Sequence, residues 1–432
     1  MQHAPSRNDT LRHDGLRSPA YLVSKSGLAD IRHWAGVFSD HCKDRRYYEL
    51  VDDTIRQGFD YRYLVFKNGR NEVSAIQPVF LLDQDLLAAT PDVIKSTAFF
   101  IRRWWPRFMQ LRTLMVGCAA GEGRLDRQSR PANNAFAVEL AQALEATART
   151  TQARLIVLKE FPSEYRNELS PLLSCGYTRI PSFPMVALQL DYADFEDYMR
   201  RGISRSMRGH LRRKFHGIEQ EPPIEMSILT DVTPIIDEVY PLYLQVYERA
   251  PLRFERLTPD FFCEIGRTMP DKARFFVWRQ AGKPVAFGLS MVHGDTVYGE
   301  YLGLDYAVAL RLHLYFIVFR DLISWSIANG YRRYVSTSLG YDPKLHLRFK
   351  LMPLDLYVRH TSPLTNNALK WFLPLLEPTR YDKTLQKFEN YDQLWDNNDG
   401  PETDRPSREA APRWRKAYKR WLQFAARRWR FK

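Results

Sequence analysis

Paired cysteines and long apolar runs are both absent from this chain. Its 432 residues include four cysteines, none in a CxxC or CxH pattern, so neither a disulfide framework nor a zinc site is indicated. No stretch approaches the roughly 18 uninterrupted apolar residues of a membrane-spanning helix, and the polar first residues contain no apolar signal core. We therefore expect a cytoplasmic protein that is soluble or attached peripherally to the inner face of the membrane.

Acidic residues are outnumbered by basic ones. The chain has 50 Asp and Glu against 63 Lys and Arg, a formal net charge of +13. This excess predicts an anionic partner without choosing among nucleic acid, phospholipid and coenzyme A phosphates. A hydrophobic content of 45% is typical of packed domains, and the length indicates two to three of them. No Ser/His/Asp or Cys/His order is recognisable, which leaves nucleophilic catalysis without a candidate.

One order of predicted elements occurs twice along the chain. The first copy contains strands at 61–67, 74–82, 112–117, 154–159 and 185–190, with a helix at 133–149. The second contains strands at 224–229, 274–279, 285–293, 296–304, 334–338 and 352–358, with helices at 232–248, 259–268 and 311–329. The repetition predicts two consecutive α/β units, each a mixed sheet flanked by helices.

Six segments follow from this pattern. They are a flexible arm (1–20), an N-terminal unit (21–192), a basic connector (193–222), a C-terminal unit (223–362), a weakly structured linker (363–409) and a basic amphipathic helix (410–432). The connector has helical spacing that places Arg205, Arg208, Arg212 and His216 on one stripe.

Four segments carry a family resemblance. They read EYLGLDY at 300–306, WSIANGYRRY at 325–334, STSLGYDPKLHLRFKLMPLDLYVRH at 336–360 and FEDYMRRGISRSMRGHLRRKF at 195–215. In order and spacing they resemble the FemAB-like, or peptidoglycan-biosynthesis-like, branch of the GNAT acyltransferase superfamily over about residues 45–360. The resemblance implies two tandem GNAT-like mixed sheets (α/β, or α+β). It also implies acyl transfer from acyl-CoA, such as acetyl-CoA, to an amine or hydroxyl of a small-molecule or cell-envelope acceptor.

The chain departs from the family at the phosphate-binding turn. Many GNAT enzymes hold the acyl-CoA pyrophosphate with a Q/RxxGxG/A turn at a helix start. The corresponding stretch here is RLHLYF at 311–316, which lacks glycine. Two alternatives therefore stay open: an aminoacyl-tRNA donor, as in Fem-type transferases, and a non-catalytic GNAT-like protein that only binds a ligand.

Two residues are candidates for acid–base catalysis. Acyl transfer to an amine requires a base for the ammonium proton and often an acid for the leaving thiolate. Glu300 lies on the predicted strand 296–304 and is the candidate base, and an exposed strand glutamate is the alternative interpretation. Tyr341 resembles the general-acid tyrosine of many GNAT enzymes, and a packed aromatic residue is its alternative.

Four more residues are candidates for binding the cofactor. Arg311 and His313 stand where the resemblance places the pyrophosphate, Gly303 lies on the same predicted strand as Glu300, and Lys344 follows Tyr341. A solvated basic surface would explain the lysine, and a satisfied core histidine would explain His313. We expect no metal.

The last segment has no acidic residue. In 410–432, the residues Trp414, Tyr418, Trp421 and Trp429 share one helical face and the cations lie opposite. This pattern is typical of a helix at an anionic membrane surface. A helix docked on the protein itself or a nucleic-acid-binding tail would also fit it.

Overall fold

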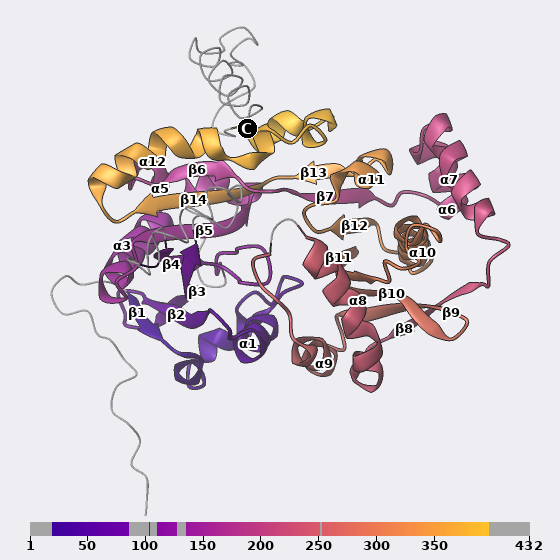
Figure 1. The fold of residues 1–432 in the computed structure, drawn as a ribbon. Coiled ribbons are helices and arrows are strands. Elements are labelled where there is room, and N and C mark those ends of the chain that lie inside the picture. Colours follow the sequence, from indigo (N-terminus) through magenta and orange to yellow (C-terminus); the bar gives the residue numbers. More distant parts are fainter. Residues whose placement is uncertain (1–19, 86–102, 104–109, 128–134, 251–252, 397–432) are drawn as a thin grey trace, which may run out of the picture. The chain divides into compact units, whose positions relative to one another are not determined.

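The computed structural model describes residues 20–85, 103, 110–127, 135–250 and 253–396. The described residues up to Trp395 form one compact unit (Figure 1). The predicted arm up to residue 19 and the predicted helix 410–432 lie outside the described residues. Among the described residues, no helix is long and apolar enough to cross a bilayer, and no group of His, Cys, Asp or Glu is arranged to hold a metal ion.

The first sheet has seven strands, in the order β1-β2-β3-β4-β5-β14-β6. Its strands are β1 (Ala20–Val23), β2 (Asp60–Lys67), β3 (Val73–Asp85), β4 (Gln110–Val116), β5 (Leu155–Pro162), β6 (Thr178–Pro181) and β14 (Leu354–His360). The pair β4–β5 is parallel and the other pairs are antiparallel. The helices of this part are α1 (Arg45–Thr54), α3 (Ala135–Thr150), α4 (Arg166–Leu169), α5 (Pro171–Ser174) and α12 (Pro363–Leu376).

The second sheet also has seven strands, in the order β13-β7-β12-β11-β10-β9-β8. They are β7 (Met185–Gln189), β8 (Ile224–Leu229), β9 (Ala273–Gln280), β10 (Lys283–His293), β11 (Thr296–Leu304), β12 (Arg333–Ser336) and β13 (Lys350–Met352). Its helices are α6 (Phe195–Asp197), α7 (Arg205–Gly217), α8 (Ile236–Arg249), α9 (Pro259–Thr268), α10 (Leu314–Ala328) and α11 (Tyr341–His346). The pair β11–β12 is parallel. Two mixed sheets flanked by helices confirm the predicted fold class.

Short turns of 3-10 or π helix complete the chain. The 3-10 turns are Lys25–Leu28, Arg32–Gly36, Ser163–Tyr165, Thr233–Ile235, Pro378–Arg380, Leu385–Lys387 and Tyr391–Leu394. A π-helical turn, Tyr198–Gly202, separates α6 from α7. The connector is therefore not one continuous helix, because the chain is extended at Ile203 and restarts at Ser204, whose side chain caps α7.

The two sheets exchange strands. Strand β7 comes from the first half of the chain but pairs with β12 and β13 in the second sheet. Strand β14 comes from the second half and lies between β5 and β6 in the first sheet. We predicted a single strand over 352–358, and this prediction is wrong at Pro353. Proline has no N–H for a sheet ladder, and the chain passes there from β13 in one sheet to β14 in the other.

Local signals account for several element ends. The Thr258 hydroxyl accepts a hydrogen bond from the Phe261 N–H at 3.2 Å, and Pro259 occupies the first turn of α9. Gly330, with φ +75°, follows α10. We predicted only weak structure for 363–409, whereas α12 occupies the start of that stretch. Its outer face carries the apolar residues Leu364, Trp371 and Phe372, which weaken the division into an apolar and a polar face.

One apolar core is shared by the two sheets. It contains Tyr47 from α1 and Phe80 from β3, together with Phe261 from α9 and Phe287 from β10. Two further cores lie on the other sides, one under α3 and one between the second sheet and α10. The shared core means that residues from distant parts of the sequence meet between the sheets.

Candidate functional site

The parallel strands β11 and β12 diverge in the middle of the second sheet. Their pairing runs from Thr296, opposite Arg333, to Gly299, opposite Ser336. Strand β12 ends at Ser336, whereas β11 continues to Leu304. Glu300 is therefore the first β11 residue beyond the paired segment, at the point where the two strands part.

Glu300 is buried and belongs to a network of four charged side chains, which we call the charged cluster. The Lys43 Nζ lies 2.9 Å from Glu300 Oε2 and 2.8 Å from Glu122 Oε2. The Arg124 Nη2 donates to Glu122 Oε1 at 3.1 Å. Lys43 precedes α1, and Glu122 and Arg124 lie in the loop after β4. The N-terminal half thus supplies three of the four members.

The two carboxyl groups of the cluster have opposite pKa shifts. Burial alone would raise the pKa of Glu122, but contacts with both Lys43 and Arg124 outweigh it and lower that pKa. Burial raises the pKa of Glu300, and repulsion from Glu122 raises it further. Lys43 lowers it, but the pKa still lies above the ordinary 4.5. Two acids held in one site with separated pKa values can play different roles. Glu122 stays ionised, and Glu300 is the carboxylate with the higher proton affinity.

Lys43 remains charged between these carboxylates. Burial disfavours its charged form, but Glu122 and Glu300 outweigh this effect and raise its pKa well above the ordinary value. A permanently charged ammonium fixes the carboxylates in place and keeps Glu300 ionisable despite its burial.

Glycines allow the loop that carries Glu122 to pack closely on its surroundings. A Cβ at Gly123 would lie 2.4 Å from the Lys159 carbonyl oxygen, and one at Gly121 would lie 3.1 Å from the Lys43 Nζ. The loop also receives a 3.0 Å hydrogen bond from the Lys159 Nζ to the Gly121 carbonyl. The glycine-rich stretch after β4 therefore serves close packing of this loop on β5.

Substitution of Gly123 by Ala should lower the free energy of unfolding by about 1–3 kcal/mol, because the added methyl group overpacks the contact with β5. We expect the displaced loop to reduce any activity that depends on Glu122. Urea denaturation measures the first effect. Gly69→Ala is the matched control, since a Cβ there would contact nothing within 4 Å. Equal stability of the two variants would contradict the close-packing role.

Tyr341, the predicted acid, is buried at the start of α11. Its hydroxyl donates a 2.9 Å hydrogen bond to the Pro184 carbonyl, and burial raises its pKa. The residue packs in the core between the second sheet and α10. In this arrangement its proton is engaged with the backbone, so a role as general acid would require that hydrogen bond to break.

Lys344 is buried in the same short helix. Its Nζ donates to the carbonyl oxygens of Thr337 and Leu339 at 2.7 and 2.8 Å. Burial lowers its pKa to about 7. Leu339 and Gly340 both have positive φ, +72° and +59°, a conformation that is rare for leucine. Lys344 therefore holds the unusual loop between β12 and α11.

The low pKa of Lys344 predicts a pH-dependent stability. The unfolded chain binds a proton at this amine up to its ordinary pKa of 10.5, and the folded chain releases it above about 7. The free energy of unfolding should therefore rise with pH between these values. Lys344→Met should remove this part of the slope, as measured by urea denaturation at neutral and alkaline pH. A matched Lys387→Met variant, at an exposed lysine, should keep the slope; identical slopes in both variants would contradict the prediction.

Arg311 and His313 lie in the turn before α10, not within it, because α10 begins at Leu314. Arg311 is exposed and forms an ion pair with Glu221. The His313 Nδ1 lies 3.3 Å from the Lys214 Nζ of α7, and burial together with Lys214 lowers the pKa of this histidine. His313 has φ +48°. A helix start beside two cations suits an anion.

Gly303 serves packing in this structure. A Cβ at this position would lie 2.6 Å from the Tyr243 backbone nitrogen, so the glycine lets α8 approach β11. The predicted residues thus occupy three places: Glu300 and Gly303 on β11, Arg311 and His313 before α10, and Tyr341 and Lys344 on α11.

Sequence reasoning missed Lys43, Glu122, Arg124 and Lys214. Lys43 and Arg124 occur among many other basic residues, and no local pattern distinguishes them. The glycines around Glu122 were the one available signal, since they marked a loop that packs tightly against its neighbours.

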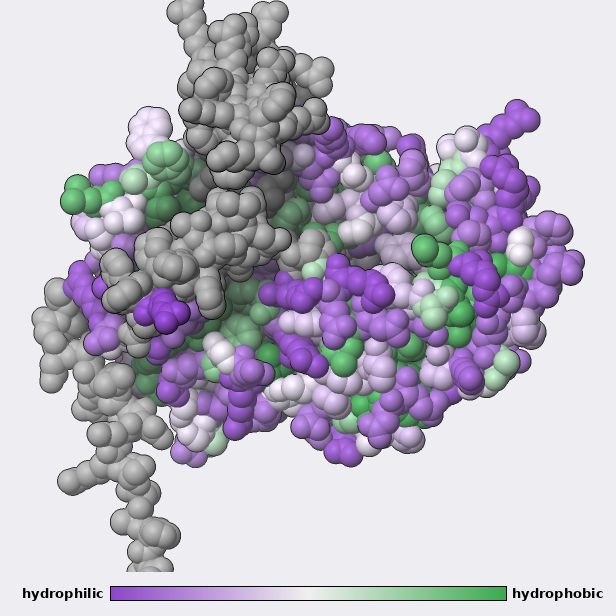
Figure 2. Space-filling view, in the orientation of Figure 1, coloured by the Kyte–Doolittle hydropathy of each residue, from purple (hydrophilic) through white to green (hydrophobic). Residues whose placement is uncertain are grey.

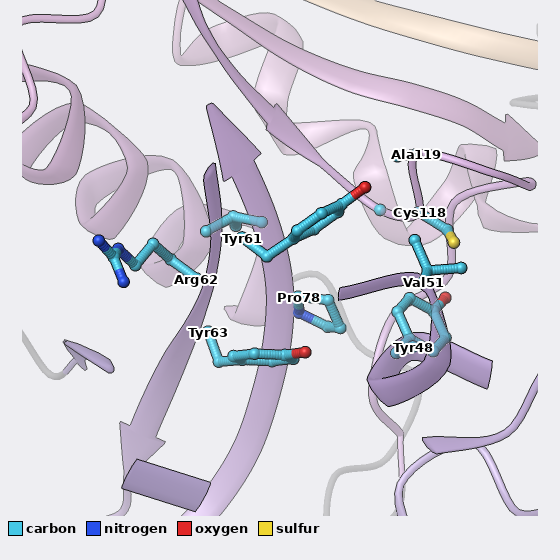
Figure 3. A pocket seen from close by; sticks show the side chains of 10 residues that line it. Tyr48, Val51, Tyr61, Arg62, Tyr63, Pro78, Cys118 and Ala119 are labelled. Atoms are coloured by element: carbon cyan, nitrogen blue, oxygen red, sulfur yellow. The ribbon is translucent and has the colours of Figure 1, made fainter. Parts of the chain in front are cut away.

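A small cavity beside the first sheet does not suit a cofactor. Its volume is about 10 Å³, and Tyr48, Tyr61, Tyr63 and Cys118 are among the residues that line it. Figure 3 shows the Tyr61 ring pointing toward Ala119 and Cys118. This volume is about the least that can hold one water molecule. Burial raises the pKa of the Cys118 thiol to about 12, so the group is not a reactive nucleophile.

Known proteins share both sequence and structural features with this chain. A putative 8-amino-7-oxononanoate synthase 2 from Mycobacterium tuberculosis is 22% identical over 285 residues, which are 62% of this chain and 35% of that protein. The chain thus spans about a third of the length of the curated relatives it matches.

Three solved structures illustrate the similarity in chain path. The C-terminal domain of a putative lysylphosphatidylglycerol synthetase from Agrobacterium fabrum has a TM-score of 0.48 at 13% identity, covering 80% of this chain and 96% of that chain. FemX has a TM-score of 0.45 at 10% identity, covering 72% and 90%. A tandem GNAT protein from the clavulanic acid biosynthesis pathway has a TM-score of 0.40 at 11% identity, covering 74% and 88%.

The family model of the acetyltransferase (GNAT) domain matches residues 205–343. This range contains α7, Glu300, the turn before α10 and the first residues of α11. The match supports the resemblance that the sequence motifs carried: residues 205–343 are similar to an acetyltransferase (GNAT) domain.

Proposed function

We propose that this protein transfers an acyl group from acyl-CoA to an amine or hydroxyl acceptor, with Glu300 as the general base. The observation that carries the proposal is the pair of buried carboxyl groups with opposite pKa shifts, placed where β11 and β12 diverge. A general base works best when its pKa is raised toward the working pH. Lys43 holds Glu300 in place and favours its ionised form, whereas repulsion from Glu122 raises its proton affinity.

In the proposed reaction, Glu300 removes a proton from the acceptor as the acceptor nitrogen or oxygen attacks the acyl carbon. Bound acyl-CoA would supply the acyl group as a thioester, which releases a thiolate. Tyr341 is the proposed acid for that thiolate. The hydrogen bond from its hydroxyl to the Pro184 carbonyl must break for this proton transfer, and Tyr341→Phe tests the role independently of Glu300.

The turn before α10 is the proposed site for the phosphates of acyl-CoA. Arg311 and Lys214 lie beside the start of α10 and form a pair of cations that suits an anion. The Arg311 guanidinium forms an ion pair with the Glu221 carboxylate in this structure. A bound phosphate would replace that carboxylate. Gly303 and Lys344 stay cofactor-site candidates from the sequence, and both have packing roles in the fold.

Calorimetric titration with acetyl-CoA, and in parallel with a longer-chain acyl-CoA, tests the donor. We expect saturable binding at one site, and Arg311→Ala should weaken it about tenfold, since a hydrogen bond to a charged group contributes about 1.5–3 kcal/mol. The matched control is Arg267→Ala, an exposed arginine paired with Glu264 on α9. Binding of neither compound would reject acyl-CoA as the donor.

An aminoacyl-tRNA donor is the second candidate. The basic stripe on α7 favours it, because Arg205 and Arg212 are exposed there. Arg212 forms an ion pair with Glu196, and Arg208 donates to the carbonyls of Met199 and Arg200. Binding of tRNA should fall steeply with added salt as phosphate contacts release counterions. Salt-insensitive or absent tRNA binding would leave acyl-CoA or a non-catalytic role.

A further inference from the structure

Helix α12 exposes apolar side chains on its outer face. Leu364, Trp371 and Phe372 are 84%, 80% and 58% exposed. The inner face is formed by Leu369 and Leu373, which pack against the shared core. The helix runs along β14 and β6 of the first sheet (Figure 1). Residues coloured green or near white occupy the corresponding upper left of the space-filling view (Figure 2).

Negative charge is absent from this helix. Its sequence, PLTNNALKWFLPLL, contains one lysine, Lys370, and no acidic residue. Exposed apolar groups gathered on one surface mark an interaction site more often than scattered ones do. A tryptophan beside leucine, phenylalanine and a lysine is the composition of a surface that lies at the boundary between lipid headgroups and acyl chains.

We propose that the outer face of α12 seats the folded protein on an anionic lipid surface. Trp371, Phe372 and Leu364 enter the headgroup boundary and Lys370 meets lipid phosphates. The contact orients the first sheet toward the membrane. The proposal is independent of acyl transfer, since it rests on residues outside the charged cluster and the GNAT domain.

Two other occupants fit this face less well. The segment 410–432 carries nine Lys and Arg and no acidic residue, so docking it on α12 would place its cations against a helix with no carboxylate to receive them. A second copy of the chain would need about 800 Å² per partner for a stable interface. Three side chains of 150–250 Å² at most supply on the order of 600 Å². An anionic bilayer satisfies both the apolar groups and the positive charge.

Vesicle sedimentation with the full chain tests the proposal. The vesicles consist of phosphatidylcholine alone or of equal parts phosphatidylcholine and phosphatidylglycerol. We expect binding to the mixed vesicles, and W371S/F372S should weaken it about tenfold or more, since each buried apolar side chain contributes about 1.5–3 kcal/mol. Ile228→Ser replaces an exposed apolar residue on β8 and should bind as the wild type does. Thermal unfolding should be the same for W371S/F372S and the wild type, because the replaced side chains are exposed.

A second measurement separates α12 from the C-terminal segment. Brominated lipids quench tryptophans that enter the bilayer, and Trp371→Phe should remove a distinct part of the quenched emission. Binding and quenching unchanged in both α12 variants would overturn the proposal, with the C-terminal segment then the lipid contact. A change of oligomeric state in W371S/F372S without a change in vesicle binding would also overturn it, in favour of a second copy.

Discussion

Glu300→Gln should lower kcat by about two orders of magnitude or more at neutral pH, the size expected for loss of a general base. Glutamine keeps the shape of the side chain and can still accept a hydrogen bond from Lys43, but it cannot take the acceptor's proton. The measurement is steady-state acyl transfer with whichever acyl-CoA the protein binds. Glu168→Gln is the matched control, because Glu168 is also buried and paired with an arginine, Arg127. A wild-type rate in Glu300→Gln would reject the proposed role.

The pH dependence gives a second readout of the same substitution. In the wild type, kcat/KM should rise with pH through the pKa of Glu300, which lies above 4.5, and this limb should be absent from Glu300→Gln. Stability should change in the opposite sense. A raised pKa means that the folded chain holds this proton longer than the unfolded chain, so the contribution of Glu300 to stability falls as pH rises through that window. The stability of the Glu300→Gln variant should not show this decrease with rising pH.

Asp355→Ala should lower the free energy of unfolding by about 3–5 kcal/mol, because it removes the carboxylate that faces the buried Arg166 and the partly buried Arg179. Asp355 is fully buried on β14. Its carboxylate accepts hydrogen bonds from the Arg166 Nε at 2.6 Å and from the Arg179 Nη1 at 3.2 Å. Urea denaturation measures the loss.

The same two arginines hold the end of the described chain. Arg166 donates to the carbonyls of Gln393 and Leu394, and Arg179 donates to that of Trp395. Loss of Asp355 should therefore also release the segment that contains Tyr391–Leu394, visible as faster amide exchange there. The matched control is Asp342→Ala, an exposed aspartate near His346, whose loss should stay below about 1 kcal/mol. A similarly small loss for Asp355→Ala would contradict the buried-pair argument.

Local chemistry predicted much of the fold. The cap at Thr258, the β10–β11 hairpin and the strand that carries Glu300 follow from turn residues and alternation that the sequence displays. The partners of β7 and β14 do not, because nothing in the sequence of either strand specifies the sheet that it joins. Their pairing is decided by the completed fold. Helix α12 was missed for a related reason, since its outer face carries apolar residues where a surface helix usually carries polar ones.

The candidate site was predictable in part. Glu300 was identifiable because the alternation of a strand near the family motif singled it out. Its partners Lys43 and Glu122 come from the other half of the chain, and their meeting depends on the core that the two sheets share. Tyr341 was predicted in a turn after a strand, whereas it lies with Lys344 on helix α11. Their burial against backbone carbonyls is a tertiary property that spacing alone does not reveal.

The exchanged strands also determine when each sheet can be completed during synthesis of the chain. The first sheet needs β14, so β5 and β6 have no partner on the sides that β14 will occupy until the ribosome has passed residue 360. At about 5–20 residues per second, synthesis from Pro181 to Leu354 takes on the order of ten seconds or more. Exposed strand edges are templates for wrong pairing during that interval. The two halves therefore mature together, and a gene divided at the connector would yield fragments that each lack a strand supplied by the other.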